Sequence, residues 1–192
     1  MKLVLATTNA NKVKEITPKL PASITLLSLK DISFEGDIPE DHDNLEDNSL
    51  QKAMTIWKLT GLNCLAEDTG LFVRSLDGEP GVYSARYAGD QKNDADNIRK
   101  LLDKLAGKDD RSAYFKTVMT LIIDGKAYLF SGILEGHITE APAGTGGFGY
   151  DPVFSLANGK TLAEIPAEEK RTLSHRAIAL GKVLDFLEQY KR

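Results

Sequence analysis

Two long segments rich in β-branched and aromatic residues constrain the fold more than any other feature of this sequence. Residues 112–124 and 127–139 meet at the dipeptide Asp124-Gly125. An Asp-Gly pair between two such segments is a strong signal for a β-hairpin, because its tight turn needs positive φ at both central residues. We therefore expect a long antiparallel strand pair in the second half of the chain.

The rest of the chain alternates strand-like and helix-like segments. A helix is expected between Asn44, which resembles an N-cap, and Gly61, which resembles a helix stop. Other strands are expected at residues 2–6, 24–29, 64–68 and 71–76, and other helices from Lys12 towards Pro18, at 95–106, and at the C-terminus along an apolar face of Leu173, Ala177, Leu180, Leu184 and Leu187. This pattern predicts an α/β fold with a mixed sheet, as one domain spanning residues 1–192.

Composition excludes several classes of function. The 24 Lys and Arg residues are balanced by 28 Asp and Glu, for a net charge of -4. A basic stripe for nucleic acid is therefore not expected, and no apolar run is long enough to cross a membrane. The apolar run Leu3 to Ala6 is too short for a signal peptide, which predicts a cytoplasmic protein. Cys64, the sole cysteine, lies in an apolar run and is interpreted as a core residue.

A glycine-rich segment, residues 144–149, fits the dinucleotide pattern G-x-G-x-x-G, but its context differs from a Rossmann fold. Tyr150-Asp151-Pro152 follow it where a helix would be needed. The segment is either a plain connection or a backbone that approaches a flat ligand closely, with Phe148 and Tyr150 as candidate stacking surfaces.

Candidate phosphate ligands lie at both ends of the chain. Residues 7–12, Thr-Thr-Asn-Ala-Asn-Lys, join a strand to a helix and would present hydroxyls, backbone N–H groups and an ammonium. Lys170, Arg171, His175 and Arg176 form a basic group near the C-terminus. Each feature alone is also typical of an ordinary solvated surface.

Asp68 closes an apolar strand-like run and is followed by Thr69-Gly70. We expect its carboxylate at a sheet edge where the chain turns sharply. The preceding loop, residues 35–48, carries seven acidic residues and no Lys or Arg. One of those carboxylates together with Asp68 would hold Mg²⁺, which takes one or two protein carboxylates and completes its shell with water and phosphate oxygens.

Read together, these segments closely resemble the inosine triphosphate pyrophosphatase family over nearly the whole chain. Six blocks occur in the family's order and spacing, which is more specific than any one of them. They are T-T-N-x-x-K at residues 7–12, E-D-N-S-x-x-K-A at 46–53, A-E-D-T-G-L at 66–71, P-G-V-Y-S-A-R-Y-A-G at 80–89, G-T-G-G-F-G-Y-D-P-V-F at 144–154 and S-H-R at 174–176.

The resemblance implies an elongated mixed sheet flanked by helices, with an active-site cleft between two lobes, and usually a homodimer. It implies Mg²⁺-dependent hydrolysis of ITP, dITP and XTP to the monophosphate and pyrophosphate. Asp68 would be the catalytic carboxylate and a metal ligand, and Glu40 the second metal ligand. The resemblance implies two groups of substrate-binding residues. The phosphates would be contacted by Thr7, Thr8, Asn9, Lys12, Lys52 and Thr69, and the base would be held by Phe148, Gly149, Tyr150, Asp151, Lys170, His175 and Arg176.

The sequence departs from the commonest family pattern at three positions. Thr69 occupies a position that is usually Ser, Glu67 one that is often Asp, and Asp47 one that is often Glu. Thr69 keeps the hydroxyl, and strand alternation should turn Glu67 away from Asp68. Two alternatives remain at this point: a relative that hydrolyses pyrimidine or modified nucleotides, and a nucleotide sensor without catalysis.

Overall fold

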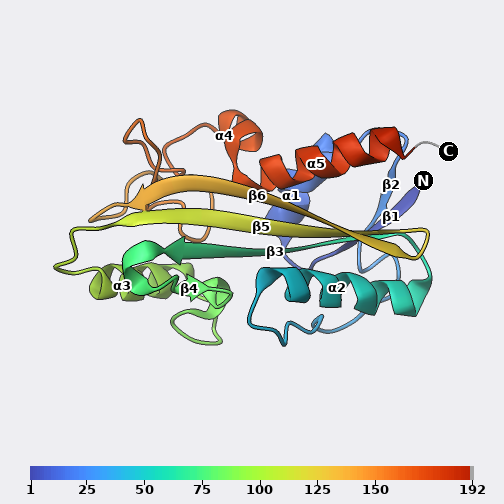
Figure 1. Ribbon diagram of the computed structural model, residues 1–192, viewed down its shortest axis with the longest axis horizontal. Coiled ribbons are helices and arrows are strands. Elements are labelled where there is room, and N and C mark those ends of the chain that lie inside the picture. The colour runs from blue at the N-terminus through green and yellow to red at the C-terminus, as the bar shows by residue number, and fades with distance from the viewer. Residues whose placement is uncertain (191–192) are drawn as a thin grey trace. The chain divides into compact units, whose positions relative to one another are not determined.

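The computed structural model describes residues 1–190 and divides into two compact units. Within the described residues, unit 1 comprises residues 1–68, 117–132 and 178–190, and unit 2 comprises residues 69–116 and 133–177. The chain therefore passes between the units several times, along strands β3, β5 and β6 and helix α5 (Figure 1).

Unit 1 begins with parallel strands. Strand β1 (Lys2–Ala6) pairs with β2 (Thr25–Leu27) on one side and with β3 (Cys64–Val73) on the other. Helix α1 (Ala10–Ile16), followed by a 3₁₀ turn (Thr17–Lys19), connects β1 to β2. The sheet order is β2-β1-β3-β5-β6-β7.

Helix α2 (Leu45–Thr60) begins and ends where the sequence predicts. The Asn44 side chain accepts the backbone N–H of Asp47, and its amide donates to the Asp47 carboxylate, both at 2.7 Å. Gly61 ends the helix with φ 67°, a conformation that costs glycine little.

Strand β3 corrects the sequence-based prediction of two strands with a sharp turn after Asp68. It runs without interruption from Cys64 to Val73, so Asp68 lies in mid-strand and the predicted sheet-edge position was wrong. Gly70, which suggested the turn, instead permits a close approach of two backbones. A Cβ on Gly70 would lie 2.6 Å from the carbonyl oxygen of Gly81, in the short strand β4 (Pro80–Gly81) that pairs with β3.

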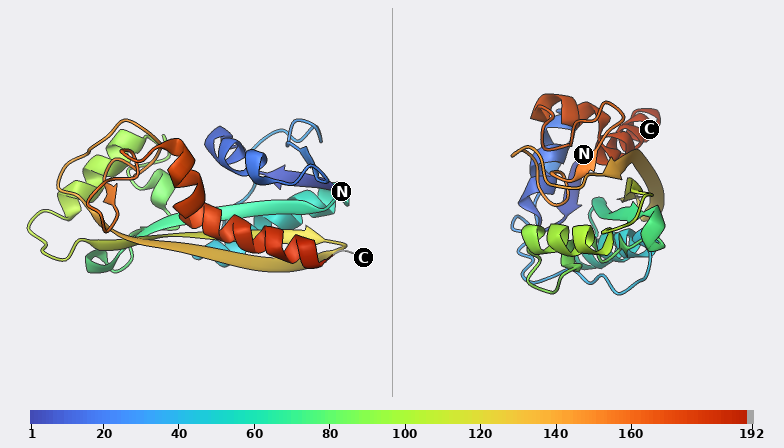
Figure 2. Two further views of the ribbon diagram at one scale, coloured as in Figure 1. Left: turned by 90° about the horizontal axis from the view of Figure 1, so that it is seen from above. Right: turned by 90° about the vertical axis from the view of Figure 1, so that its left-hand side faces the viewer.

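The predicted hairpin is confirmed. Strands β5 (Ser112–Ile123) and β6 (Lys126–Ile138) are neighbours in the sheet. Asp124 and Gly125 have φ of 50° and 76°, as the tight turn requires. In unit 1 the C-terminal part of α5 packs along this hairpin, with Phe186 4.5 Å from the ring of Tyr128 (Figure 2).

The C-terminal apolar face is divided between two helices, α4 (Ala167–Leu173) and α5 (His175–Gln189). The expectation of one helix from Leu173 was therefore wrong. Ser174 is extended and its hydroxyl accepts the N–H of Ala177 at 3.1 Å, which caps the new helix. As a result Leu173 packs in unit 2, whereas Leu180 packs in unit 1.

Unit 2 also contains helix α3 (Asp94–Lys104), strand β7 (Phe154–Ser155), which pairs with β6, and 3₁₀ turns at Arg74–Leu76 and Ser84–Arg86. Unit 2 has one hydrophobic core and unit 1 has two. That of unit 2 includes Leu71, Leu101, Phe115, Val153 and Phe154, and those of unit 1 include Leu3, Leu65, Met119, Leu180, Val4, Ala53 and Ile56.

The mixed sheet flanked by helices confirms the predicted fold class. The cleft between two lobes stays a prediction. Within residues 1–190, no helix has the length and hydrophobicity needed to span a membrane.

Candidate active site

Unit 1 contains a group of three side chains, here called the carboxylate–lysine cluster: the buried Lys52 and Asp68, and the partly exposed Glu40. The Lys52 ammonium lies 2.5 Å from Oε1 of Glu40 and 3.1 Å from Oδ1 of Asp68. Both distances run to the same Nζ, so the two carboxylates come within reach of one cation. Lys52 is 5% exposed and Asp68 7%, so water screens the bond between these two side chains poorly, whereas Glu40 is partly exposed.

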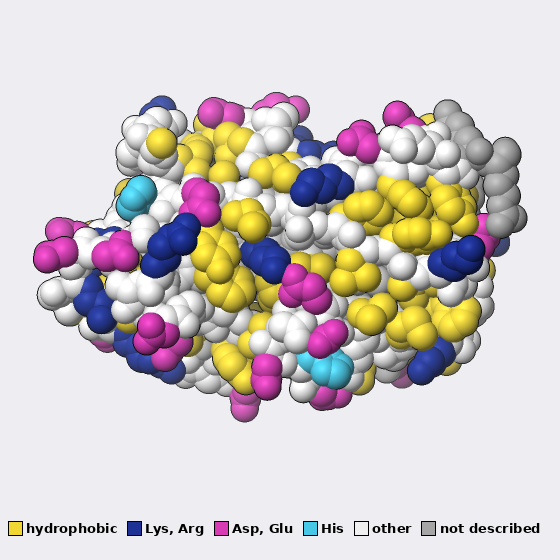
Figure 3. Space-filling view, in the orientation of Figure 1, with side chains coloured by type: hydrophobic (Ala, Val, Ile, Leu, Met, Phe, Trp, Pro, Cys, Tyr) yellow, Lys and Arg dark blue, Asp and Glu magenta, His cyan; other side chains and the backbone are white. Residues whose placement is uncertain are grey.

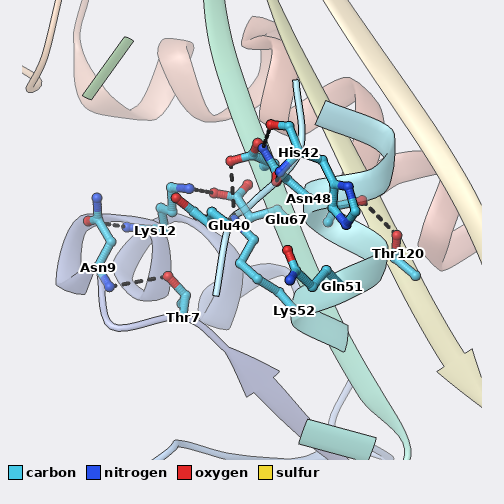
Figure 4. Close-up of polar contacts among 12 residues, drawn as sticks. Thr7, Asn9, Lys12, Glu40, His42, Asn48, Gln51, Lys52, Glu67 and Thr120 are labelled. Atoms are coloured by element: carbon cyan, nitrogen blue, oxygen red, sulfur yellow. Dashed lines mark hydrogen bonds and ion pairs between the residues drawn. The ribbon is translucent and has the colours of Figure 1, made fainter. Parts of the chain in front are cut away.

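Helix α2 positions both Lys52 and the acidic loop that carries Glu40. Two pairs of hydrogen bonds tie the loop to the helix, and Figure 4 shows Asn48 and His42, which make the first pair. The Asn48 amide accepts the His42 N–H and donates to the His42 carbonyl, at 2.9 and 3.0 Å. The Gln51 amide accepts the Asp41 N–H at 3.0 Å and donates to the Asp41 carboxylate at 2.7 Å. The acidic loop is thus held against the helix one turn before Lys52.

Electrostatic effects in this cluster oppose one another. Burial raises the pKa of Asp68, and the Lys52 ammonium offsets that rise only in part. Burial alone would lower the pKa of Lys52, but attraction to Asp68 and Glu40 outweighs it, so the pKa of Lys52 is raised. Lys52 therefore stays protonated at neutral pH, and Asp68 is a better proton acceptor than an exposed aspartate.

Glu67 is a site residue that sequence reasoning left out. Its side chain is 1% exposed and Oε1 lies 2.9 Å from the ammonium of Lys12 (Figure 4). Glu67 thus holds a lysine that was predicted to bind phosphate. The signal was present in the sequence, because a buried strand position rarely carries an acid without a partner.

The other predicted phosphate ligands, residues 7–12, form the entry into α1. Thr7 Oγ1 accepts the Asn9 N–H at 3.1 Å, and Asn9 Oδ1 accepts the N–H groups of Asn11 and Lys12 at 2.9 and 3.3 Å. The Asn9 cap thus uses two of the donors that were expected to face phosphate. Thr8 is exposed on the same turn.

The donor set fits a magnesium ion. Within residues 1–190, three or more His, Cys, Asp or Glu side chains never gather into a metal-binding group. Mg²⁺ does not need such a group, because it keeps several waters and uses one or two carboxylates. Glu40 and Asp68 both lie within 3.1 Å of one ammonium, so two carboxylates are available close together.

Unit 2 contains the second candidate group, here called the Phe148 cluster: Phe148, Asp151, Lys170 and Arg176. The Phe148 ring centroid is 5.0 Å from the Lys170 ammonium and 5.8 Å from the Arg176 guanidinium carbon, both within cation–π range. Asp151 Oδ2 accepts from Lys170 Nζ and, at 2.8 Å, from the Phe148 N–H. A Cβ on Gly147 would collide with the Asp151 carboxylate, so this loop needs glycine there.

Two more predicted base-binding residues lie beside this cluster. His175 is 4% exposed and stacks on Phe115 with 4.7 Å between ring centroids. Tyr150 is buried in the core of unit 2 and donates its hydroxyl to the Ser84 carbonyl at 2.8 Å. The ring of Tyr150 is thus a packing element, and Phe148 is the more accessible aromatic surface.

The sequence-predicted residues therefore separate by unit. Unit 1 brings together Glu40, Lys52 and Asp68 and positions Lys12 through Glu67. Unit 2 brings together Phe148, Asp151, Lys170 and Arg176, with His175 and Gly149 next to them in the chain. Thr69 lies on β3 as the first residue of unit 2.

This α/β protein combines a carboxylate–lysine cluster with a separate aromatic and basic cluster. Such side chains are typical of a hydrolase that acts on small anionic substrates. Comparison with known proteins narrows this class. Residues 3–186 match the Ham1 family, and the chain belongs to that family.

Relatives that match over their full length support this family assignment. The chain is 53% identical to the dITP/XTP pyrophosphatase of Flavobacterium johnsoniae, over 100% of both proteins. It is 51% identical to that of Christiangramia forsetii, over 98% of this chain and 100% of the relative. Among solved structures, the Staphylococcus aureus Ham1 protein is similar with a TM-score of 0.92 at 35% identity, over 100% of both chains.

Proposed function

We propose that this chain hydrolyses the non-canonical purine nucleotides ITP, dITP and XTP to the nucleoside monophosphate and pyrophosphate. The observation that carries the proposal is the full-length likeness to dITP/XTP pyrophosphatases in a chain whose buried Asp68 faces a lysine and a second carboxylate. Such an enzyme removes abnormal nucleotides before they are incorporated into nucleic acid.

In the proposed reaction Asp68 accepts a hydrogen bond from the attacking water and orients it towards the α-phosphorus. Its raised pKa suits this role, because a better proton acceptor activates water more effectively. Lys52 and Lys12 supply positive charge for the phosphate oxygens and the departing pyrophosphate. Mg²⁺, held by Glu40 and Asp68, would neutralise phosphate charge and make the α-phosphorus more electrophilic.

Base selection in the proposal follows from hydrogen-bond polarity in unit 2. The Arg176 guanidinium and backbone N–H groups donate, so they suit the 6-oxo group of hypoxanthine and xanthine and oppose the 6-amino group of adenine. Unpaired buried donors discriminate by about 10⁴-fold in favourable sites. Phe148 would stack on the purine, and Lys170 and Asp151 would hold that ring in place.

The decisive experiment is a set of steady-state rates on ITP, XTP, dITP, GTP, ATP and UTP with Mg²⁺, in which pyrophosphate and orthophosphate release are measured separately. The proposal expects ITP, XTP and dITP to have the highest kcat/KM and pyrophosphate to be the product. A preference for UTP or ATP would contradict the substrate assignment, and binding without turnover would favour a nucleotide sensor.

The proposal includes a homodimer in the cytoplasm that does not bind nucleic acid. Hydrophobic side chains gather in the right half of the face in Figure 3, and Leu129 and Ile133 of β6 are 45% and 46% exposed. Apolar residues on a strand face are typical of subunit contacts. Sedimentation equilibrium would test this, with a monomer mass at micromolar concentration as the contradicting result.

A further inference from the structure

The loop that carries Phe148 contains glycines, which favour backbone flexibility, but two hydrogen bonds restrain it. Gly147 and Gly149, on either side of Phe148, have φ of 75° and 61°, so neither flanking residue restricts the backbone as a side chain would. The direction of the Phe148 ring therefore depends on what fixes the two peptide groups that flank its Cα.

Each of these two peptide groups donates its N–H to a carboxylate. The N–H of Phe148 donates to Asp151 Oδ2 at 2.8 Å, a contact within the loop itself. The N–H of Gly149 donates to Asp94 Oδ2, also at 2.8 Å, from a residue 55 positions away in the chain. Asp151 belongs to the Phe148 cluster, whereas neither the motifs nor the resemblance includes Asp94.

Asp94 is presented by a well-anchored element. It is the first residue of α3, whose N-cap Asn93 accepts the Asp96 N–H at 3.0 Å. The Asn97 amide accepts the Ala88 N–H and donates to the Ala85 carbonyl, at 2.7 and 3.1 Å. Ile98 and Leu101 on the same helix lie in the core of unit 2. A carboxylate on such a support can hold a glycine loop in one conformation at low entropic cost.

We infer that Asp94 is a positioning residue for base binding: its carboxylate holds the Gly149 N–H and so fixes Phe148 in the orientation that stacks on the purine. The inference rests on the proposed function for the role of Phe148, but the contact itself does not. Asp94 acts on the binding of the base and not on the phosphate chemistry, which depends on residues of unit 1.

The test compares Asp94→Ala, Asp94→Asn and a matched control, Asp96→Ala. Asp96 is an acid in the same first turn of α3, and its partner is Arg99 at 2.6 Å, outside the glycine loop. The control therefore loses the same kind of favourable charge at the helix N-terminus. Asn at position 94 keeps an oxygen that can accept the Gly149 N–H.

For Asp94→Ala we expect KM for ITP to rise about tenfold with kcat within about twofold of wild type, since a charge-assisted hydrogen bond is lost. The inhibition constant of inorganic tripolyphosphate, which has no base, should not change. Amide hydrogen exchange of the peptide containing Gly149 should accelerate about tenfold. Asp94→Asn should recover most of the KM, and Asp96→Ala should match wild type.

Three results would overturn the inference: an unchanged KM in Asp94→Ala, a parallel rise in KM and in the tripolyphosphate constant, or unchanged exchange at Gly149. A wild-type protein that fails to hydrolyse ITP would instead contradict the proposed function. The exchange measurement would still test the Asp94 contact in that case, so the two failures are distinguishable.

Discussion

The two units hold their charged residues in opposite ways. In unit 1, the carboxylates of Glu40 and Asp68 surround one ammonium, so this group has one more negative than positive charge. In unit 2, one carboxylate, Asp151, accompanies the cations of Lys170 and Arg176 around an aromatic ring. The cluster in unit 1 is thus a cation held by two carboxylates, and the cluster in unit 2 is an aromatic ring beside two cations.

Under the proposed function, this difference assigns each cluster to a different part of the nucleotide. In that proposal, two carboxylates beside the phosphate site are the physical reason to expect that a divalent cation accompanies the triphosphate. A ring beside two cationic donors attracts a flat group rich in oxygen acceptors. If the two clusters act independently, a change in one should leave the other unaffected.

The largest expected effect is that of Asp68→Asn, which removes the proposed water-orienting carboxylate. We expect kcat for ITP to fall by on the order of 10³-fold or more, with little change in binding of the base. The same chemical change at Asp77, an exposed turn residue, is the control. Pyrophosphate release and inosine binding give the two readouts, and a loss below about tenfold would contradict the role of Asp68.

The next effect concerns stability in unit 1. Lys52→Met leaves two carboxylates without their buried ammonium, and breaking such a pair costs about 3 kcal/mol. The loss should be smaller near pH 5 than at pH 8. The pKa of Asp68 is already raised, so without Lys52 the folded protein holds a proton at Asp68 at low pH and becomes less stable as pH rises.

Denaturant unfolding at both pH values measures this prediction, with Lys58→Met on the exposed face of α2 as control. A free energy of unfolding equal to wild type at pH 8, or a larger loss at pH 5, would show that the cluster is not buried as described.

A smaller, selective effect is expected in unit 2. Phe148→Leu keeps an apolar side chain but removes the aromatic face, which is worth about 1–3 kcal/mol per stacked base. KM for ITP should rise about tenfold, whereas inhibition by tripolyphosphate should stay at the wild-type value. Equal changes in the KM for ITP and in the inhibition constant of tripolyphosphate would mean that the two clusters do not act independently.

The last prediction is that the Cys64 thiol is protected from chemical labelling, a measurement that reports on unit 1 alone. Cys64 is 0% exposed, and burial raises the pKa of its thiol to about 12. Labelling by a thiol reagent at pH 8 should therefore be negligible in native protein and complete in denaturant. Rapid labelling of the native protein would reveal that the core of unit 1 opens readily.

Much of the fold follows from local patterns. The hairpin at Asp124-Gly125 and helix α2 between Asn44 and Gly61 depend on residues that are adjacent in sequence. The continuous strand β3 could not be predicted in this way, because Gly70 is required by a contact with Gly81 that only the folded chain creates. A glycine that permits a turn and one that permits close packing look the same in sequence.

The site shows the same limit. The resemblance assigned Glu40, Lys52 and Asp68, and the structure brings these three together. It did not assign Glu67, which holds Lys12, or Asp94, which holds the Gly149 N–H. Both act through another residue, and neither belongs to a local pattern that names its partner.

In the proposed reaction, water oriented by Asp68 attacks the α-phosphorus. Hydrolysis of ITP in ¹⁸O-labelled water is the sharpest test of this step, because the label marks the phosphorus that was attacked. Attack at the α-phosphorus places one ¹⁸O atom in IMP and none in pyrophosphate. Label in pyrophosphate, or release of labelled orthophosphate, would contradict it.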